Sequence, residues 1–97
     1  DLSSAISFII ENDINNSLMN VGSSEEVSIL GLAEMIKDVV GFKGIIAFDE
    51  TKPNGNDRKL LDSSLINSFG WRPKIGLNEG LDKTYSWYVN NYDKLRV

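Results

Sequence analysis

Apolar residues recur with the period of an amphipathic helix in three parts of the chain, within residues 2–11, 29–40 and 77–91. The middle part carries the clearest signals. Ser28 precedes it as an N-cap whose hydroxyl can accept a bond from a first-turn N–H. Gly41 follows it and can adopt the positive φ with which many helices end. We therefore predict three main helices.

Two short apolar runs have the length and the flanking residues of buried strands. The first covers Leu18–Val21 and the second is "GIIAF" at 44–48. Further on, Asp62 can cap a short helix over 63–69 that Gly70 would close. The order helix, strand, helix, strand, helix, helix predicts an α/β fold. Because two isolated strands make a poor sheet, the pattern is typical of part of a larger α/β protein.

The composition excludes several function classes. The 97 residues carry a formal net charge of -4, with no Cys and no His. A broad nucleic-acid or anionic-membrane surface needs clustered positive charge, so we expect neither partner. Disulfides, thiolate or histidine metal sites and a Ser-His-Asp triad are impossible. The longest apolar run falls far short of the roughly 20 residues that span a bilayer.

The stretch "KPNGNDRKLLD" at 52–62 is the best candidate for chemistry. Pro-Asn-Gly at 53–55 favours a tight turn that would bring Lys52 toward Arg58 and Lys59. Cations beside free backbone N–H groups suit a phosphate or diphosphate. Asp57, the neighbour of Arg58, would compete with phosphate for it. The alternative is an ordinary solvated loop, and the pattern alone favours that alternative.

Carboxylates and aromatic residues have simpler interpretations. Asp49 and Glu50 are expected to end a strand, and Asp62 to cap a helix, although paired carboxylates can also serve acid–base chemistry. The aromatic residues of the last helical stretch, among them Trp87, are expected to pack in a core. The same holds for Trp71, whose alternative is base stacking.

Three segments together resemble the GDP-L-fucose synthase family of the extended short-chain dehydrogenase/reductases. They are "NVGSSEEVSILGLAEMIKDVVGFKG", "FDETKPNGNDRKLLD" and "FGWRPKIGLNEGLDKTYSWYVNN". The segment from Phe48 to Asp62 is the most specific of the three. The block from Gly70 to Leu81 is common to many nucleotide-sugar epimerases and dehydratases.

The resemblance implies the C-terminal portion of an NAD(P)-binding, Rossmann-type enzyme with an α/β fold. Residues 1–22 would supply the last helix and strand of the Rossmann layer. Residues 23–97 would form the C-terminal substrate-binding lobe, as a single compact unit. Asn54, Arg58 and Lys59 would bind the GDP-sugar substrate, with the two cations on the phosphates and Asn54 near the nucleoside.

For the parent enzyme, the resemblance implies 3,5-epimerisation and 4-reduction of GDP-4-keto-6-deoxy-D-mannose with NADPH, in the cytoplasm and as a homodimer. The NADPH-binding and catalytic residues would precede this chain, so the isolated chain is expected to be inactive. Uncovered apolar faces also predict self-association of the chain. Two alternatives stay open: part of another nucleotide-sugar epimerase or dehydratase, and a truncated module that is not an enzyme.

Overall fold

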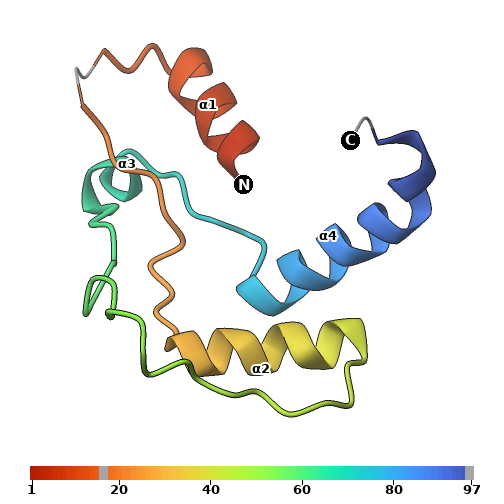
Figure 1. Cartoon of the computed structure of the whole chain (residues 1–97). Coiled ribbons are helices and arrows are strands. Elements are labelled where there is room, and N and C mark those ends of the chain that lie inside the picture. The colour runs from red at the N-terminus through yellow and green to blue at the C-terminus, as the bar shows by residue number, and fades with distance from the viewer. Residues whose placement is uncertain (16–17, 96–97) are drawn as a thin grey trace. The chain divides into compact units, whose positions relative to one another are not determined.

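The computed structural model describes residues 1–15 and 18–95 and contains four α-helices there (Figure 1). Their bounds are Leu2–Glu11 for α1, Ile29–Val40 for α2, Ser64–Ser68 for α3 and Leu77–Asn91 for α4. A single 3-10 turn, η1, follows α4 at Tyr92–Lys94. The three main helices predicted from the apolar period are therefore confirmed.

The predicted helix ends are confirmed in detail at α2. The Ser28 Oγ accepts a hydrogen bond from the Gly31 N–H at 3.0 Å. Gly41 adopts φ 70, the left-handed conformation that costs glycine little. The short helix α3 begins after Ser63, one residue later than predicted. Asp62 still satisfies one of its first N–H groups, because its Oδ1 accepts from the Ser64 N–H at 2.9 Å.

The predicted strands are wrong. Neither Leu18–Val21 nor 44–48 forms a strand, and the described residues contain no sheet. A strand needs a neighbouring strand to satisfy its backbone N–H and C=O groups. Neither run has a neighbouring strand within residues 1–15 and 18–95, and Leu18 and Ile45 are 80% and 91% exposed. A helix and a strand were expected in residues 1–22. The described part of this range instead contains the helix α1 followed by an extended segment.

The chain divides into two compact units, and each is built from two separate pieces of sequence. Unit 1 comprises Asp1–Glu26 and Asn56–Gly76. Unit 2 comprises Val27–Gly55 and Leu77–Val97. The predicted boundary at residue 22 concerns a longer enzyme and stays a prediction.

Unit 1 packs α1 and α3 around a small apolar core. Ala5 and Ile66 are fully buried, and Trp71 is 6% exposed. Partly buried side chains surround these three: Phe8, Ile9, Met19 and Val21. The indole N–H of Trp71 donates to the Ser4 Oγ at 3.0 Å, which satisfies its one polar group. The prediction that Trp71 belongs to a core is confirmed.

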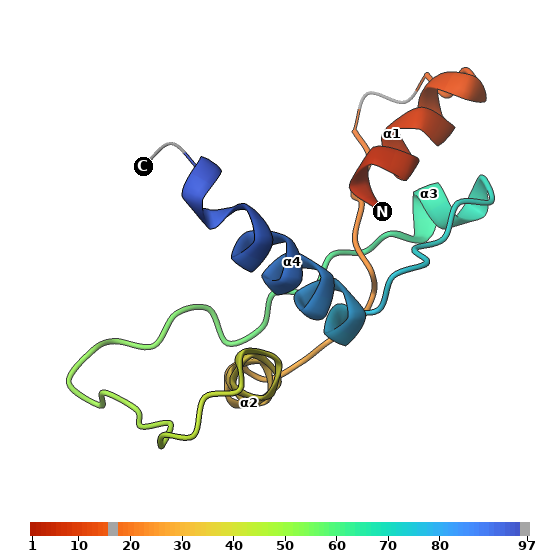
Figure 2. The same cartoon turned by 90° about the vertical axis from the view of Figure 1, so that its right-hand side faces the viewer.

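Unit 2 pairs α2 with α4, which lie side by side in both views (Figures 1 and 2). An apolar hollow of about 280 Å³ lies between the two helices. Its lining residues are Ile36, Val39, Val40, Leu81, Thr84, Tyr85 and Tyr88. Trp87 is 58% exposed, so the expectation that it packs in a core is wrong. It does not belong to the face of α4 that contacts α2.

Candidate functional site

Two extended segments of unit 1, residues 20–26 and 56–63, lie side by side and run in opposite directions (Figure 1). At one end, the Ser63 Oγ donates to the Gly22 carbonyl at 3.2 Å. At the other end, Arg58 contacts Glu26. Gly22 permits this close approach, because a Cβ there would lie 3.3 Å from the Ser63 Oγ and 3.4 Å from the Leu61 Cβ.

Arg58 and Glu26 form a two-point ion pair. The Arg58 Nη2 donates to the Glu26 Oε2 at 2.7 Å, and the Arg58 Nε donates to the Oε1. These bonds lower the pKa of Glu26 and raise the pKa of Arg58. Both side chains remain open to solvent, at 68% exposed for Arg58 and 47% for Glu26. Both therefore stay charged at neutral pH and within reach of a ligand.

Asp57 was expected to be the carboxylate that competes for Arg58, whereas in the structure Glu26 binds it. The two partners are 32 residues apart in sequence, so no local pattern could connect them. The only available signal was the acidic pair Glu25-Glu26 close to the "NVGS" segment.

Lys59, the second predicted phosphate ligand, is exposed and lines an open pocket of about 190 Å³. The opposite wall is the 22–25 segment, and Leu60 and Leu61 complete the lining. Within the described residues Lys59 makes no ion pair, so its ammonium group is available to an anion. Arg58 and Lys59 thus lie next to each other on one segment, one paired and one unpaired.

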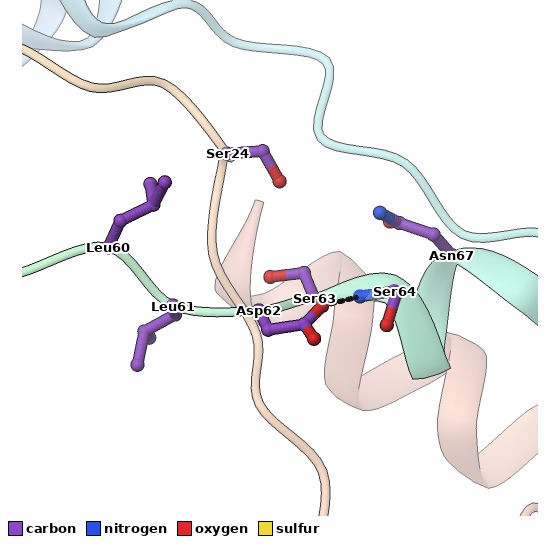
Figure 3. Close-up of a pocket in the computed structure, with 7 residues that line it drawn as sticks. All are labelled: Ser24, Leu60, Leu61, Asp62, Ser63, Ser64 and Asn67. Atoms are coloured by element: carbon purple, nitrogen blue, oxygen red, sulfur yellow. Dashed lines mark hydrogen bonds between the residues drawn. The ribbon is translucent and has the colours of Figure 1, made fainter.

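A second open pocket, of about 360 Å³, shares Ser24, Leu60 and Leu61 with the pocket that Lys59 lines (Figure 3). Ser24, Leu60, Leu61, the 62–64 segment and Asn67 line it. The Asp62 carboxylate lies at its edge, and the backbone hydrogen bond from Ser64 lowers the pKa of Asp62. The buried Asn67 Oδ1 has no hydrogen-bond partner among the described residues. The pocket therefore offers one accessible carboxylate, that of Asp62, which suits hydroxyl or N–H donors better than phosphate.

Asn54, the third predicted ligand residue, lies in unit 2 and is exposed. Its role as a ligand residue stays a prediction. The tight turn predicted at 53–55 is wrong, since the hydrogen-bonded turn lies at 49–52, where the Lys52 N–H donates to the Asp49 carbonyl at 3.3 Å.

The Asp49 side chain explains this shift of the turn. Its Oδ1 accepts from the Thr51 N–H at 3.0 Å and from the Thr51 Oγ1 at 2.5 Å. An aspartate that binds the backbone two residues on stabilises a turn at its own position. Asp49 is thus a turn residue, and its hydrogen bonds to Thr51 lower its pKa.

No group of three or more acidic side chains in residues 1–15 and 18–95 could hold a metal ion. None of the helices in that part of the chain combines the length and the apolar character needed to cross a bilayer.

Comparison with known proteins gives the context of this site. The chain is 50% identical over 91 residues to the protein named "Probable GDP-L-fucose synthase 1" of Oryza sativa subsp. japonica. It is 46% identical over 91 residues to the GDP-L-fucose synthase of Sinorhizobium fredii. Each match covers 94% of this chain. The resemblance to GDP-L-fucose synthases is confirmed. No protein-family model matches the chain.

The chain spans less than a third of the length of these GDP-L-fucose synthases, 28% and 29% respectively. The solved structure of DdhaC matches 99% of this chain with a TM-score of 0.75 and 34% identity, and 29% of that structure is covered. A GDP-L-colitose synthase of Yersinia pseudotuberculosis is 36% identical over 72 residues, which are 74% of this chain and 23% of that protein.

Proposed function

We propose that this chain is the C-terminal, substrate-binding part of an NADP-dependent GDP-L-fucose synthase. The parent enzyme would convert GDP-4-keto-6-deoxy-D-mannose to GDP-L-fucose by 3,5-epimerisation and 4-reduction. The observation that carries the proposal is 46–50% identity over 94% of the chain to proteins of that name. The isolated chain binds the GDP-sugar and does not transform it.

The local geometry supports a nucleoside diphosphate as ligand. Arg58 and Lys59 present two exposed cations from one extended segment, which suits a diphosphate. The exposed Asp62 carboxylate offers an acceptor in the adjoining pocket, which suits the hydroxyl and N–H donors of a nucleoside. A ligand with phosphates at one end and hydroxyls at the other matches this order of groups.

Asn54 remains a proposed ligand residue near the nucleoside. It belongs to unit 2, so its part in binding is tested separately from that of the two cations. Asn54→Ala should weaken GDP binding while leaving the affinity for inorganic diphosphate unchanged. Equal losses for both ligands would contradict a nucleoside contact.

A titration of the chain with GDP, UDP and dTDP, followed by NMR, tests the proposal. We expect GDP to bind most tightly and to shift the resonances of residues 58–64. Lys59→Ala should weaken GDP binding about tenfold or more, as expected for one charge-assisted contact to phosphate. Lys43→Ala is the matched control, because it removes the same charge from an exposed position in unit 2. A preference for UDP or dTDP would favour the alternative of another nucleotide-sugar enzyme.

NADPH would be the reductant of the parent enzyme. The chain contains no G-x-G-x-x-G motif, so none of its residues is assigned to the cofactor. We further propose a cytoplasmic, homodimeric parent. Self-association of the isolated chain is also proposed, and exposed apolar side chains along α1 support it: Leu2, Ile6 and Ile10 are 66%, 51% and 73% exposed.

A further inference from the structure

We propose that Glu26 is a positioning residue that holds the Arg58 guanidinium in the orientation that binds the ligand's diphosphate. The inference rests on the proposed function, and it assigns a role to a residue outside the "KPNGNDRKLLD" segment.

The geometry of the pair leaves Arg58 able to bind a second anion. A guanidinium carries five N–H donors, and Glu26 occupies one on Nε and one on Nη2. Glu26 does not use the two N–H donors on Nη1. Because Arg58 is 68% exposed, a phosphate can reach that edge without displacing the carboxylate.

A hydrogen bond near the ion pair holds the two backbone segments together. Gly22 and Ser63 join the same two segments four to five residues away, through the 3.2 Å hydrogen bond between Ser63 Oγ and the Gly22 carbonyl. Arg58 itself lies in a segment without regular secondary structure. Without Glu26, its long side chain would have no hydrogen-bond partner among the described residues to restrict its rotamers, and a ligand would have to immobilise it.

The position of the pair also matters for Lys59. Glu26 directly follows the 22–25 segment, which forms one wall of the pocket that Lys59 lines. The ion pair therefore joins the two segments that line this pocket, one residue beyond Glu25 and one residue before Lys59.

The opposite arrangement, in which Glu26 competes with phosphate for Arg58, makes a prediction of opposite sign. Removing a competitor would tighten ligand binding, whereas removing a positioning residue weakens it. The sign of one affinity change therefore separates the two.

The experiment is an NMR titration of the 97-residue chain with GDP, with the Arg58 Nε–H resonance as a second readout. Glu26→Ala should weaken GDP binding about three- to tenfold, the cost of immobilising one long side chain. It should also shift the Nε–H resonance toward that of a free arginine. Glu26→Asp, which retains the charge, should recover part of the affinity. Glu50→Ala is the matched control, since it removes an exposed carboxylate from unit 2.

A double-mutant cycle tests whether Glu26 acts through Arg58. In an Arg58→Ala background, Glu26→Ala should leave GDP affinity unchanged. Unchanged or tighter GDP binding by Glu26→Ala in the native background overturns the inference. If Glu26→Ala does not fold, Glu26→Gln, which keeps two polar groups of the same shape, gives the same test of sign.

The proposed function fails in a different way. If the Arg58→Ala variant binds GDP as tightly as the native chain, Arg58 does not bind the phosphates, whatever the effect of Glu26→Ala. A native chain that binds no GDP removes substrate binding altogether, and the inference falls with it.

Discussion

Ile66→Val tests whether the core of unit 1 is packed as the structure describes. Ile66 is fully buried beside Ala5 and Trp71, so the lost methylene leaves a void inside the cluster. The expected loss is about 1 kcal/mol of unfolding free energy, within the range for buried Ile-to-Val changes. With an m-value near 1 kcal/mol/M for so small a unit, the urea midpoint should fall by about 1 M.

The two tryptophans allow each unit to be observed separately. Trp71 lies in the core of unit 1, whereas Trp87 is 58% exposed in unit 2. In a Trp87→Phe background, fluorescence during urea unfolding therefore reports on unit 1 alone. The same change at an exposed position, Ile45→Val, is the control, because Ile45 is 91% exposed and should shift nothing. Equal midpoints for the Ile66 and Ile45 variants would refute the packing described for unit 1.

The remaining predictions concern backbone conformation and pH. Ser24 and Gly41 both adopt positive φ, at 60 and 70. Ser24→Gly should therefore relieve strain and raise the unfolding free energy by up to about 1 kcal/mol. Gly41→Ala should lower the unfolding free energy by about 1–2 kcal/mol. Circular dichroism during urea unfolding measures both, and midpoint shifts of the same sign would contradict the conformations described. Hydrogen bonds lower the pKa of three carboxylates, Glu26, Asp49 and Asp62, below their ordinary values of 4.5, 3.8 and 3.8. Near and below those pH values the unfolded state therefore binds more protons than the folded state. Stability should be flat from about pH 6 to 8 and fall below about pH 4, and a urea midpoint that rises on acidification would be the contrary result.

Helices could be predicted from the sequence because their determinants are local. The apolar period, the Ser28 hydroxyl and the Gly41 conformation act within one or two turns, and α2 and α4 form where they indicate. The strands could not be predicted in the same way, because a strand depends on a partner elsewhere. Leu18–Val21 has strand-like composition and no neighbouring strand in the described residues.

The two cations of the candidate site could be singled out from the sequence, whereas the residues around them could not. Arg58 and Lys59 stand out in an acidic chain, and the resemblance gave them a role. Glu26 could not be linked to Arg58 from the sequence, since the contact depends on how two distant segments pair. The turn expected at 53–55 formed at 49–52, because the side-chain oxygen of Asp49 binds Thr51.

The interleaving of the two units has a practical consequence for protein engineering. Trimming the chain from either end cannot release one unit intact, since each is built from two pieces of sequence. An internal excision, combined with removal of the residues after Gly76, is expected to release unit 1. Glu26 and Arg58 already touch across the break in unit 1, so a short turn in place of residues 27–55 spans the gap. The product would be a minimal scaffold that carries Arg58, Lys59 and both adjoining pockets on one continuous chain.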